Sequence, residues 1–491
     1  MRLLRRSFLT ALSASAFAPV LPAFAENPPA EAAAADPGSF TTDGSKNRFF
    51  RGLDAGLNFY RSIEERGGWP VIPGERTLKK GSQGPAVPPL RTRLSMTGDY
   101  IGTETDSDVF DGELREAVVA YQNRNGMEPD GVAGPKTLAD MNVPVATRIK
   151  QMEINRERWN RMPASLGERF VLVNMAGYEL DVVEGEKTVL TMKVIVGRNF
   201  TRTPMFSDTI QYIEFNPYWN VPRSIATGEL VPEYVEKGTA SAERQGFEVK
   251  RGDEVLPVSA INWSEYLGRE KLPFLIRQRP GPANALGEMK FMFPNKNNVY
   301  LHDTNQRHLF AKTRRAFSHG CVRVEKPHEL AEYLLRPNTI ETGRDWSLPA
   351  VQAVVDGKQL EAVPLKRKVP VHLAYMTAWM DEFGLIQFRE DIYGRDAILK
   401  SELYPDGKAG GDPLAAELLA EKERADALAE AELAAQTQME LEAFERGATV
   451  TGSTAPAPEN LIPPAEAPNP LEGSDSLGEF IQGRELPPLS D

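Results

Sequence analysis

The chain has 491 residues, 41% of them hydrophobic, which predicts two or three compact domains. Its formal net charge of -12 and its lack of Lys and Arg clusters argue against a nucleic-acid partner, because phosphate binding needs concentrated positive charge. Cys321 is the only cysteine, so an internal disulfide is excluded and the surroundings of the thiol must explain it.

The N-terminus predicts an export signal over residues 1–25. Arg5 and Arg6 precede an apolar, Ala-rich stretch (8–21), and Ala23-Phe24-Ala25 offers a small-x-small cleavage site. The arginine pair with the Phe and Leu that follow it resembles a twin-arginine signal, and the ordinary secretory route is the alternative. The stretch is too short to stay in a membrane, and no later apolar run spans one. We therefore expect a periplasmic or otherwise extracytoplasmic protein without a permanent membrane span.

Residues 78–143 predict a small domain of three helices. Apolar residues recur at helical spacing up to Leu94 and again from Asp111, and Pro135 suits the first turn of a third helix. Turn glycines and helix positions together resemble the peptidoglycan-binding module of bacterial wall enzymes. The residues that carry this resemblance are Gly84, Val87, Leu90, Leu94, Gly98, Ala117, Val118, Tyr121, Gln122, Asp130, Gly131, Val132, Gly134, Pro135, Thr137 and Leu138.

From Arg169 the pattern changes to short β-rich runs separated by Gly, Asn, Asp or Pro. No long helical pattern lies between these runs, which favours a mainly-β sandwich or barrel over a parallel βαβ sheet. Between 217 and 287 the strand rhythm weakens. We interpret that segment as an irregular, mobile lid over the site.

Cys321 lies in Ser318-His319-Gly320-Cys321-Val322-Arg323, nineteen residues after His302. A buried structural cysteine is the alternative for any lone thiol. The flanking residues favour a nucleophile, because imidazoles supply a base and a preceding glycine lets backbone N–H groups approach an oxyanion. A strand over 298–302 would place Tyr300 and His302 on one face.

Three segments together resemble the catalytic domain of the L,D-transpeptidases (YkuD-type, in the long YcbB-like branch). They are Asn216-Pro217-Tyr218-Trp219-Asn220-Val221-Pro222, Tyr300-Leu301-His302-Asp303-Thr304 and Ser318-His319-Gly320-Cys321-Val322-Arg323-Val324. The resemblance implies a cysteine acyltransferase that forms a thioester with peptidoglycan tetrapeptide stems and makes 3→3 cross-links with acceptor stems. Asp303 departs from shorter members, many of which carry Gly there.

The resemblance assigns catalytic roles within these segments. A free thiol has a pKa of about 8.5, so Cys321 as nucleophile needs a base, and His302 is the candidate. Asp303 is expected to orient His302 through its backbone carbonyl. His319 is expected to shape the oxyanion hole, and the N–H groups of Gly320 and Cys321 to face the oxyanion.

Five further residues are predicted to contact the substrate. Arg323 either holds a substrate carboxylate or braces its loop, and both roles stay open. Tyr218 and Trp219 are predicted to line the acyl-donor groove, and Tyr300 and Ser318 to flank the thiol. The remaining histidines have no partner pattern and are expected to be structural or at the surface: His308, His328 and His372. The sequence predicts no metal site and no cofactor.

Other functions fit these residues less well or share the same chemistry. A papain-like peptidase is disfavoured, because its histidine would follow its cysteine, and a non-enzymatic wall-binding protein would leave the Cys-His pair without a purpose. Attachment of an envelope protein to the wall and exchange of D-amino acids share the chemistry and remain alternatives.

The sequence thus predicts a multidomain α+β chain. Its predicted segments are a signal peptide (1–25), a linker (26–44), an N-terminal helical segment (45–77), a peptidoglycan-binding-like domain (78–143), a connecting helix (144–168), the catalytic domain (169–345, lid about 217–287), its C-terminal extension (346–400), an Ala/Glu-rich helix (401–446) and a disordered tail (447–491).

Overall fold

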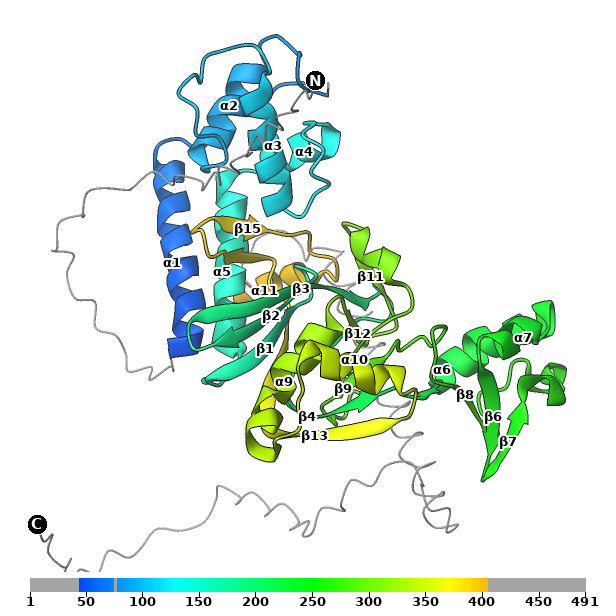
Figure 1. Ribbon diagram of the computed structural model, residues 1–491. Helices are drawn as coiled ribbons and strands as arrows, with labels where there is room; N and C mark the ends of the chain where they lie inside the picture. The colour runs from blue at the N-terminus through cyan, green and yellow to red at the C-terminus, as the bar shows by residue number, and fades with distance from the viewer. Residues whose placement is uncertain (1–43, 75–76, 405–491) are drawn as a thin grey trace, which may run out of the picture.

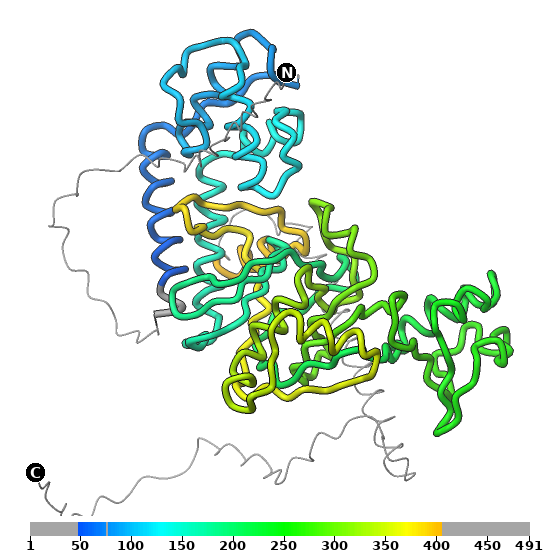
Figure 2. Tube along the Cα trace, in the orientation of Figure 1, coloured from blue at the N-terminus to red at the C-terminus, as the bar shows by residue number. Residues whose placement is uncertain are grey.

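The computed structural model describes residues 44–74 and 77–404 (Figure 1). The predicted signal peptide, the linker up to residue 43, the acidic helix beyond residue 404 and the tail all lie outside the described residues. Figure 2 follows the chain from the helical module at the top, through a central sheet, to an inserted subdomain at the right.

Five helices precede the sheet. They are α1 (Gly44–Glu65), α2 (Val87–Met96), α3 (Gly112–Arg124), α4 (Pro135–Met141) and α5 (Val145–Arg161). The sequence signals act locally: the Asp111 side chain caps α3 by accepting a 2.8 Å hydrogen bond from the Leu114 N–H, and Pro135 opens α4. Helices α2 to α4 enclose one apolar core, and α1 packs beside α5 in a second.

The central sheet closes on itself. Its strands are β1 (Arg169–Asn174), β2 (Glu179–Glu184), β3 (Lys187–Gly197), β4 (Phe206–Phe215), β9 (Met289–Met292), β10 (Leu301–His302), β11 (Ala316–Ser318), β12 (Val322–Val324) and β13 (Glu361–Ala374). Their order is β11-β3-β12-β10-β9-β4-β13-β1-β2, and β2 also pairs with β3. The prediction of a mainly-β catalytic domain within a multidomain α+β chain is confirmed. The sheet shares one core with α9 (Pro327–Thr342) and α10 (Leu348–Asp356).

The predicted C-terminal extension, residues 346–400, is built into this framework. Strand β13 lies between β4 and β1, in antiparallel and parallel pairing respectively. The hairpin of β14 (Ala378–Met380) and β15 (Ile386–Phe388) then joins the core of α1 and α5, and α11 (Arg395–Leu403) follows. This segment therefore both completes the sheet and connects it to the helices.

Residues 217–287 form a folded subdomain, so the expectation of an irregular segment is wrong, while its role as a mobile lid stays a prediction. Its sheet has the order β5-β8-β6-β7: β5 (Trp219–Asn220), β6 (Phe247–Arg251), β7 (Glu254–Pro257) and β8 (Leu275–Gln278). Short helices α6 (Arg223–Ile225), α7 (Val231–Lys237) and α8 (Ala240–Arg244) accompany it, with a π-helical turn at Ala226–Leu230 and 3-10 turns at Val258–Ala260 and Trp263–Tyr266. The subdomain has its own apolar core and projects from the side of the main sheet (Figure 1). Strands of two to five residues give too few alternations to be recognised in sequence.

Arg124, buried and paired with Asp99 inside the helical module, also joins the module to the rest of the protein. Arg124 on α3 binds the Asp99 carboxylate through Nε (2.8 Å) and Nη2 (2.6 Å), and donates through Nη1 to the Ile386 carbonyl of β15. Arg389 in turn donates to the Arg124 carbonyl at 2.5 Å. In the part of the chain that the structure describes, no helix is both long and apolar enough to cross a bilayer.

We expect Arg124→Met to lower the free energy of unfolding by about 3–5 kcal/mol, because it leaves the buried Asp99 carboxylate without its cation. Arg115→Met on the same helix is the matched control: its partner Glu116 is 69% exposed, and the loss should stay below about 1 kcal/mol. Urea denaturation of both variants measures the difference. Equal losses would mean that the buried pair contributes no more to stability than the exposed one.

Candidate active site

Two neighbouring strands carry the candidate catalytic residues. Strands β10 and β12 are parallel, with Leu301 opposite Val322 and His302 opposite Arg323. Leu301 and Val322 are fully buried in the core, so alternation places His302 and Arg323, with Cys321 just before β12, on the other face. Cys321 and His302 thus lie diagonally across adjacent strands, with Cα atoms about 8 Å apart by strand geometry.

A hydrogen bond fixes the tautomer of His302. Its Nδ1 lies 2.5 Å from the Asp303 carbonyl oxygen. A carbonyl oxygen only accepts hydrogen bonds, so Nδ1 carries the proton and Nε2 keeps a basic lone pair. Burial lowers the pKa of His302 to about 3, and the positive charges of Arg323 and Lys290 act in the same direction. His302 is therefore neutral at pH 7 and able to accept a proton.

The Asp303 carbonyl is where the predicted orienting role requires it. The Asp303 side chain, almost fully buried, accepts hydrogen bonds from the Glu288 N–H (3.0 Å) and from Arg307 Nη1 (2.6 Å). Gly287 packs against it with φ of 61°, and a Cβ at that position would collide with the Asp303 carboxylate. Sequence analysis did not single out Gly287, Glu288 or Arg307, whose spacing carries no recognisable motif.

The Cys321 thiol is half-buried and lies beside Tyr300. The thiol donates toward the Asn298 carbonyl oxygen, 3.7 Å away. Burial raises the pKa of Cys321, while Tyr300, Lys290 and Arg323 partly offset that rise. The resting group is a thiol, so an attack on a carbonyl requires a base.

The nucleophile loop is held from within by Ser318. Its hydroxyl donates to the Cys321 carbonyl (2.5 Å) and accepts from the Gly320 N–H (3.2 Å), and Ser318 is buried. Two predictions need correction: Ser318 braces the loop instead of facing the substrate, and the Gly320 N–H is engaged inside the loop. Gly320 has φ of 116°, which only glycine adopts readily. The Cys321 N–H is left as the candidate oxyanion donor.

The segment between β3 and β4 holds the same loop from outside. The Ser318 carbonyl accepts from the Arg198 N–H and from Thr201 Oγ1, both at 3.0 Å. Thr203, fully buried, donates from Oγ1 to the Gly320 carbonyl at 2.7 Å. Hydroxyl residues in a polar turn give no sequence signal, so Thr201 and Thr203 were missed.

His319 contacts the inserted subdomain. Its Nε2 lies 2.6 Å from Glu229 Oε1 in the π-helical turn, and the ring is partly exposed. The described contacts of Tyr218 and Trp219 are also with the subdomain: the Arg277 guanidinium lies 4.5 Å from the Tyr218 ring centre, and Trp219 packs edge-on against Phe247. These contacts place both aromatic residues at the root of the subdomain.

Arg323 has a bracing contact, and its contact with a substrate carboxylate stays a prediction. It shares the face of Cys321 and donates from Nη1 to Gln306 Oε1 at 2.8 Å, so it braces a neighbouring turn. Among the other histidines, His372 is structural, bonded to Ser207 Oγ (2.8 Å) and the Leu166 carbonyl (2.9 Å). No group of three or more His, Cys, Asp or Glu within residues 44–74 and 77–404 is placed to hold a metal ion.

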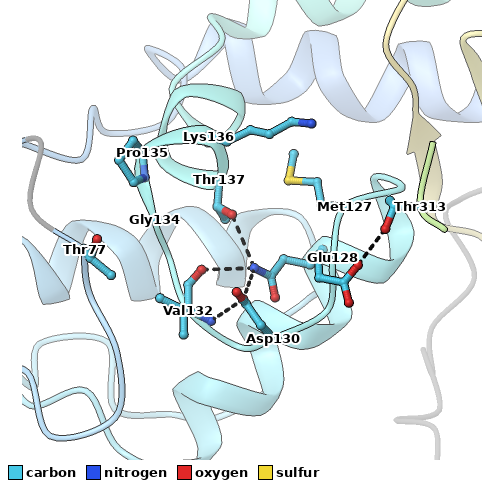
Figure 3. Close-up of a pocket in the computed structure, with 11 residues that line it drawn as sticks. Thr77, Met127, Glu128, Asp130, Val132, Gly134, Pro135, Lys136, Thr137 and Thr313 are labelled. Atoms are coloured by element: carbon cyan, nitrogen blue, oxygen red, sulfur yellow. Dashed lines mark hydrogen bonds between the residues drawn. The ribbon is translucent and has the colours of Figure 1, made fainter. Parts of the chain in front are cut away.

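A separate pocket of about 340 Å³ lies on the helical module (Figure 3). Gln122 Nε2 donates there to Asp130 Oδ1 (2.8 Å) and to the Val132 carbonyl (3.0 Å). Thr313, from the loop leading to the nucleophile, donates to Glu128 Oε2 at 2.7 Å on the rim. The module and the catalytic domain therefore meet at this pocket.

Comparisons with known proteins agree with this division. Residues 168–356 match the family described as "L,D-transpeptidase catalytic domain" (YkuD), and residues 83–141 match the "Putative peptidoglycan binding domain". A Haemophilus influenzae protein described as "Putative L,D-transpeptidase" is 33% identical over 226 residues, 46% of this chain and 44% of that protein. The match thus spans less than half the length of this curated relative.

Two solved structures cover 61% of this chain. The L,D-transpeptidase (Yku) of Stackebrandtia nassauensis is 15% identical over 96% of its own chain, with a TM-score of 0.24. The L,D-transpeptidase of Xylanimonas cellulosilytica is 17% identical over 98% of its chain, with a TM-score of 0.16.

The closed sheet that carries Cys321 and His302 thus coincides with the match to the L,D-transpeptidase (YkuD) catalytic-domain family. The match to the peptidoglycan-binding domain family precedes it.

The low pKa of His302 predicts acid lability. Below about pH 6.5 the unfolded state protonates this histidine and the native state does not, so stability contributed by neutral His302 is complete above that pH and is lost progressively toward pH 3. Between pH 8 and pH 4.5 the wild type should lose about 2–3 kcal/mol more than His302→Gln, measured by urea unfolding at both pH values. The same pH dependence in both proteins would contradict a neutral buried His302.

We expect Gly287→Ala to cost about 1–3 kcal/mol of stability and to slow acylation of Cys321 at least tenfold, because the new Cβ displaces Asp303. Gly268→Ala is the control, since Gly268 has φ of 73° and open space around it. The stability lost by Gly268→Ala measures the effect of backbone strain alone. Similar effects of both substitutions on acylation would exclude the Asp303 contact as the cause.

Proposed function

We propose that this protein is an exported L,D-transpeptidase that makes 3→3 cross-links in peptidoglycan. The observation that carries the proposal is the neutral His302, held by the Asp303 carbonyl with Nε2 available, on the same sheet face as the Cys321 thiol. The family of residues 168–356 supports the reaction class. The family of residues 83–141 supports peptidoglycan as the substrate.

The proposed reaction has two acyl-transfer steps. His302 accepts the Cys321 proton as sulfur attacks the carbonyl of the third stem residue, and the same proton passes to the nitrogen of the departing fourth residue. The side-chain amine of an acceptor stem then attacks the thioester, the C–S bond breaks, and the amine proton passes through His302 to the released Cys321 sulfur. The Cys321 N–H stabilises the oxyanion in both steps.

The docked module supports delivery of wall substrate to the site. Buried Arg124 of the module donates to the Ile386 carbonyl and accepts from Arg389, and Thr313 connects the module to the loop that leads to Cys321. A glycan strand bound to the module would therefore keep a fixed direction relative to the thiol. Such positioning raises the effective concentration of a stem at the site.

We expect Cys321→Ala to abolish product formation from disaccharide-tetrapeptides while costing at most about 1–2 kcal/mol of stability. Mass spectrometry should detect a thioester adduct on the wild type and 3→3 dimers in solution, and neither with the variant. Products that carry only an exchanged terminal amino acid, or a stem joined to an envelope protein, would point to the alternative reactions. Dimers formed by the variant would show that Cys321 is not the nucleophile.

The export proposal concerns residues 1–25 and is tested separately. A reporter fused to these residues should reach the periplasm of a bacterial host, and Arg5→Lys with Arg6→Lys should block this if the twin-arginine route is used. Retained export would assign the ordinary secretory route. A reporter that stays in the cytoplasm in both forms would contradict export.

A further inference from the structure

A row of charged and titratable side chains crosses four strands at the active site. Glu214 on β4 pairs with Lys290 on β9, Lys290 with His302 on β10, and His302 with Arg323 on β12. Paired residues share a sheet face, so all four side chains stand on the face of Cys321. His302 is thus flanked by a cation on each side.

Lys290 is held in place by its surroundings. Its neighbours along β9, Met289 and Phe291, are fully buried in the core, so alternation turns Lys290 to the active-site face. Its Nζ lies 3.5 Å from Glu214 Oε2 and 4.2 Å from the centre of the Tyr300 ring. The side chain is only 14% exposed, and no motif of the sequence singled it out.

The Tyr300 ring connects Lys290 to the nucleophile. A cation over an aromatic face withdraws electron density from the ring, which makes the phenol O–H a better hydrogen-bond donor. Tyr300 and Lys290 both lower the pKa of Cys321, so positive charge at Lys290 favours sulfur in its thiolate form. The same charge disfavours a second proton on His302.

We propose that Lys290, held by Glu214 against Tyr300, is a positioning residue that favours the Cys321 thiolate and keeps the abstracted proton from resting on His302. The proton passes from Cys321 Sγ to His302 Nε2 and on to the leaving nitrogen. Protonated His302 would lie between two cations, which makes it unstable. The proton therefore stays on His302 only briefly before it passes to the leaving nitrogen. This direction of delivery rests on the proposed function, whereas the effect on the thiol does not.

Other groups near Cys321 set the size of the effect. Tyr300 and Arg323 act on the thiol together with Lys290, Glu214 acts on Tyr300, and His302 stands on the same sheet face. Arg198, which follows β3, acts on Arg323, and His319 of the nucleophile loop pairs with Glu229 of the subdomain. Arg323 remains when Lys290 is replaced, so only part of the stabilisation of the Cys321 thiolate should be lost. A single charge at this range in a partly buried site shifts a pKa by about one unit.

The test is the pH dependence of alkylation of the full chain by iodoacetamide between pH 6 and 11. Cys321 is the sole thiol, and His302 is already neutral in this range, so the inflection of the rate belongs to Cys321. Lys290→Met, which keeps the volume, should raise the inflection by about one unit. Lys290→Arg should restore the wild-type value.

Glu214→Gln is the matched variant with the opposite expectation. It removes the negative charge and leaves the ammonium group, so the inflection should fall below the wild-type value. A general disturbance of the sheet would move both variants the same way. The proposal is overturned if Lys290→Met leaves the inflection unchanged, or if Glu214→Gln leaves it unchanged or raises it. The Glu214→Gln result stands by itself should Lys290→Met fail to fold.

Transfer assays separate this inference from the proposed function. Lys290→Met should lower kcat with disaccharide-tetrapeptides about tenfold at pH 7 and leave KM within about twofold, because one pKa unit is a factor of ten in thiolate. A raised KM with unchanged kcat would assign Lys290 to substrate binding and overturn the proposal. A wild-type protein that makes no product would contradict the transpeptidase function, while the alkylation profiles would still decide the role of Lys290.

Discussion

The hydrogen bond from His302 Nδ1 to the Asp303 carbonyl is the constraint on which the active site depends. It fixes the tautomer, so the basic lone pair lies on Nε2. The bond in turn requires an immobile Asp303, which the Glu288 N–H, Arg307 and the close approach of Gly287 provide. A backbone carbonyl can perform this task without adding a second negative charge to a buried site, which leaves the histidine neutral and ready to accept a proton.

The closed sheet determines the electrostatics around that histidine. Strand β10 lies between β9 and β12, so the residues in register with His302 are Lys290 and Arg323. Two cations and burial lower the pKa of His302, while the same cations partly offset the effect of burial on Cys321. One arrangement of charge therefore acts on base and nucleophile together. It depends on which strands are neighbours in the sheet.

Two folded units meet the catalytic domain near the nucleophile loop. The helical module contacts the segment that leads to this loop through Glu128 and Thr313, and the inserted subdomain contacts the loop itself through Glu229 and His319. Each contact is a single polar pair between a partly exposed side chain and a charged partner, and such pairs form and break at little cost. The module is also docked through the bonds of Arg124 with Ile386 and Arg389, and the subdomain has its own core, so both stay folded whether these contacts form or not.

The sequence alone determined what is local: the three helices of the module, the glycine before a lone thiol, and the alternation that places Tyr300 and His302 on one face. These follow from periodicity and backbone freedom within a few residues. Only the tertiary structure decided the strands of the inserted subdomain, the bracing role of Ser318, the hydroxyl contacts of Thr203 and the placement of Lys290 beside His302. Each of these depends on which strands or loops become neighbours across long stretches of chain. That pairing is set by burial of the whole core, and no short window of sequence contains it.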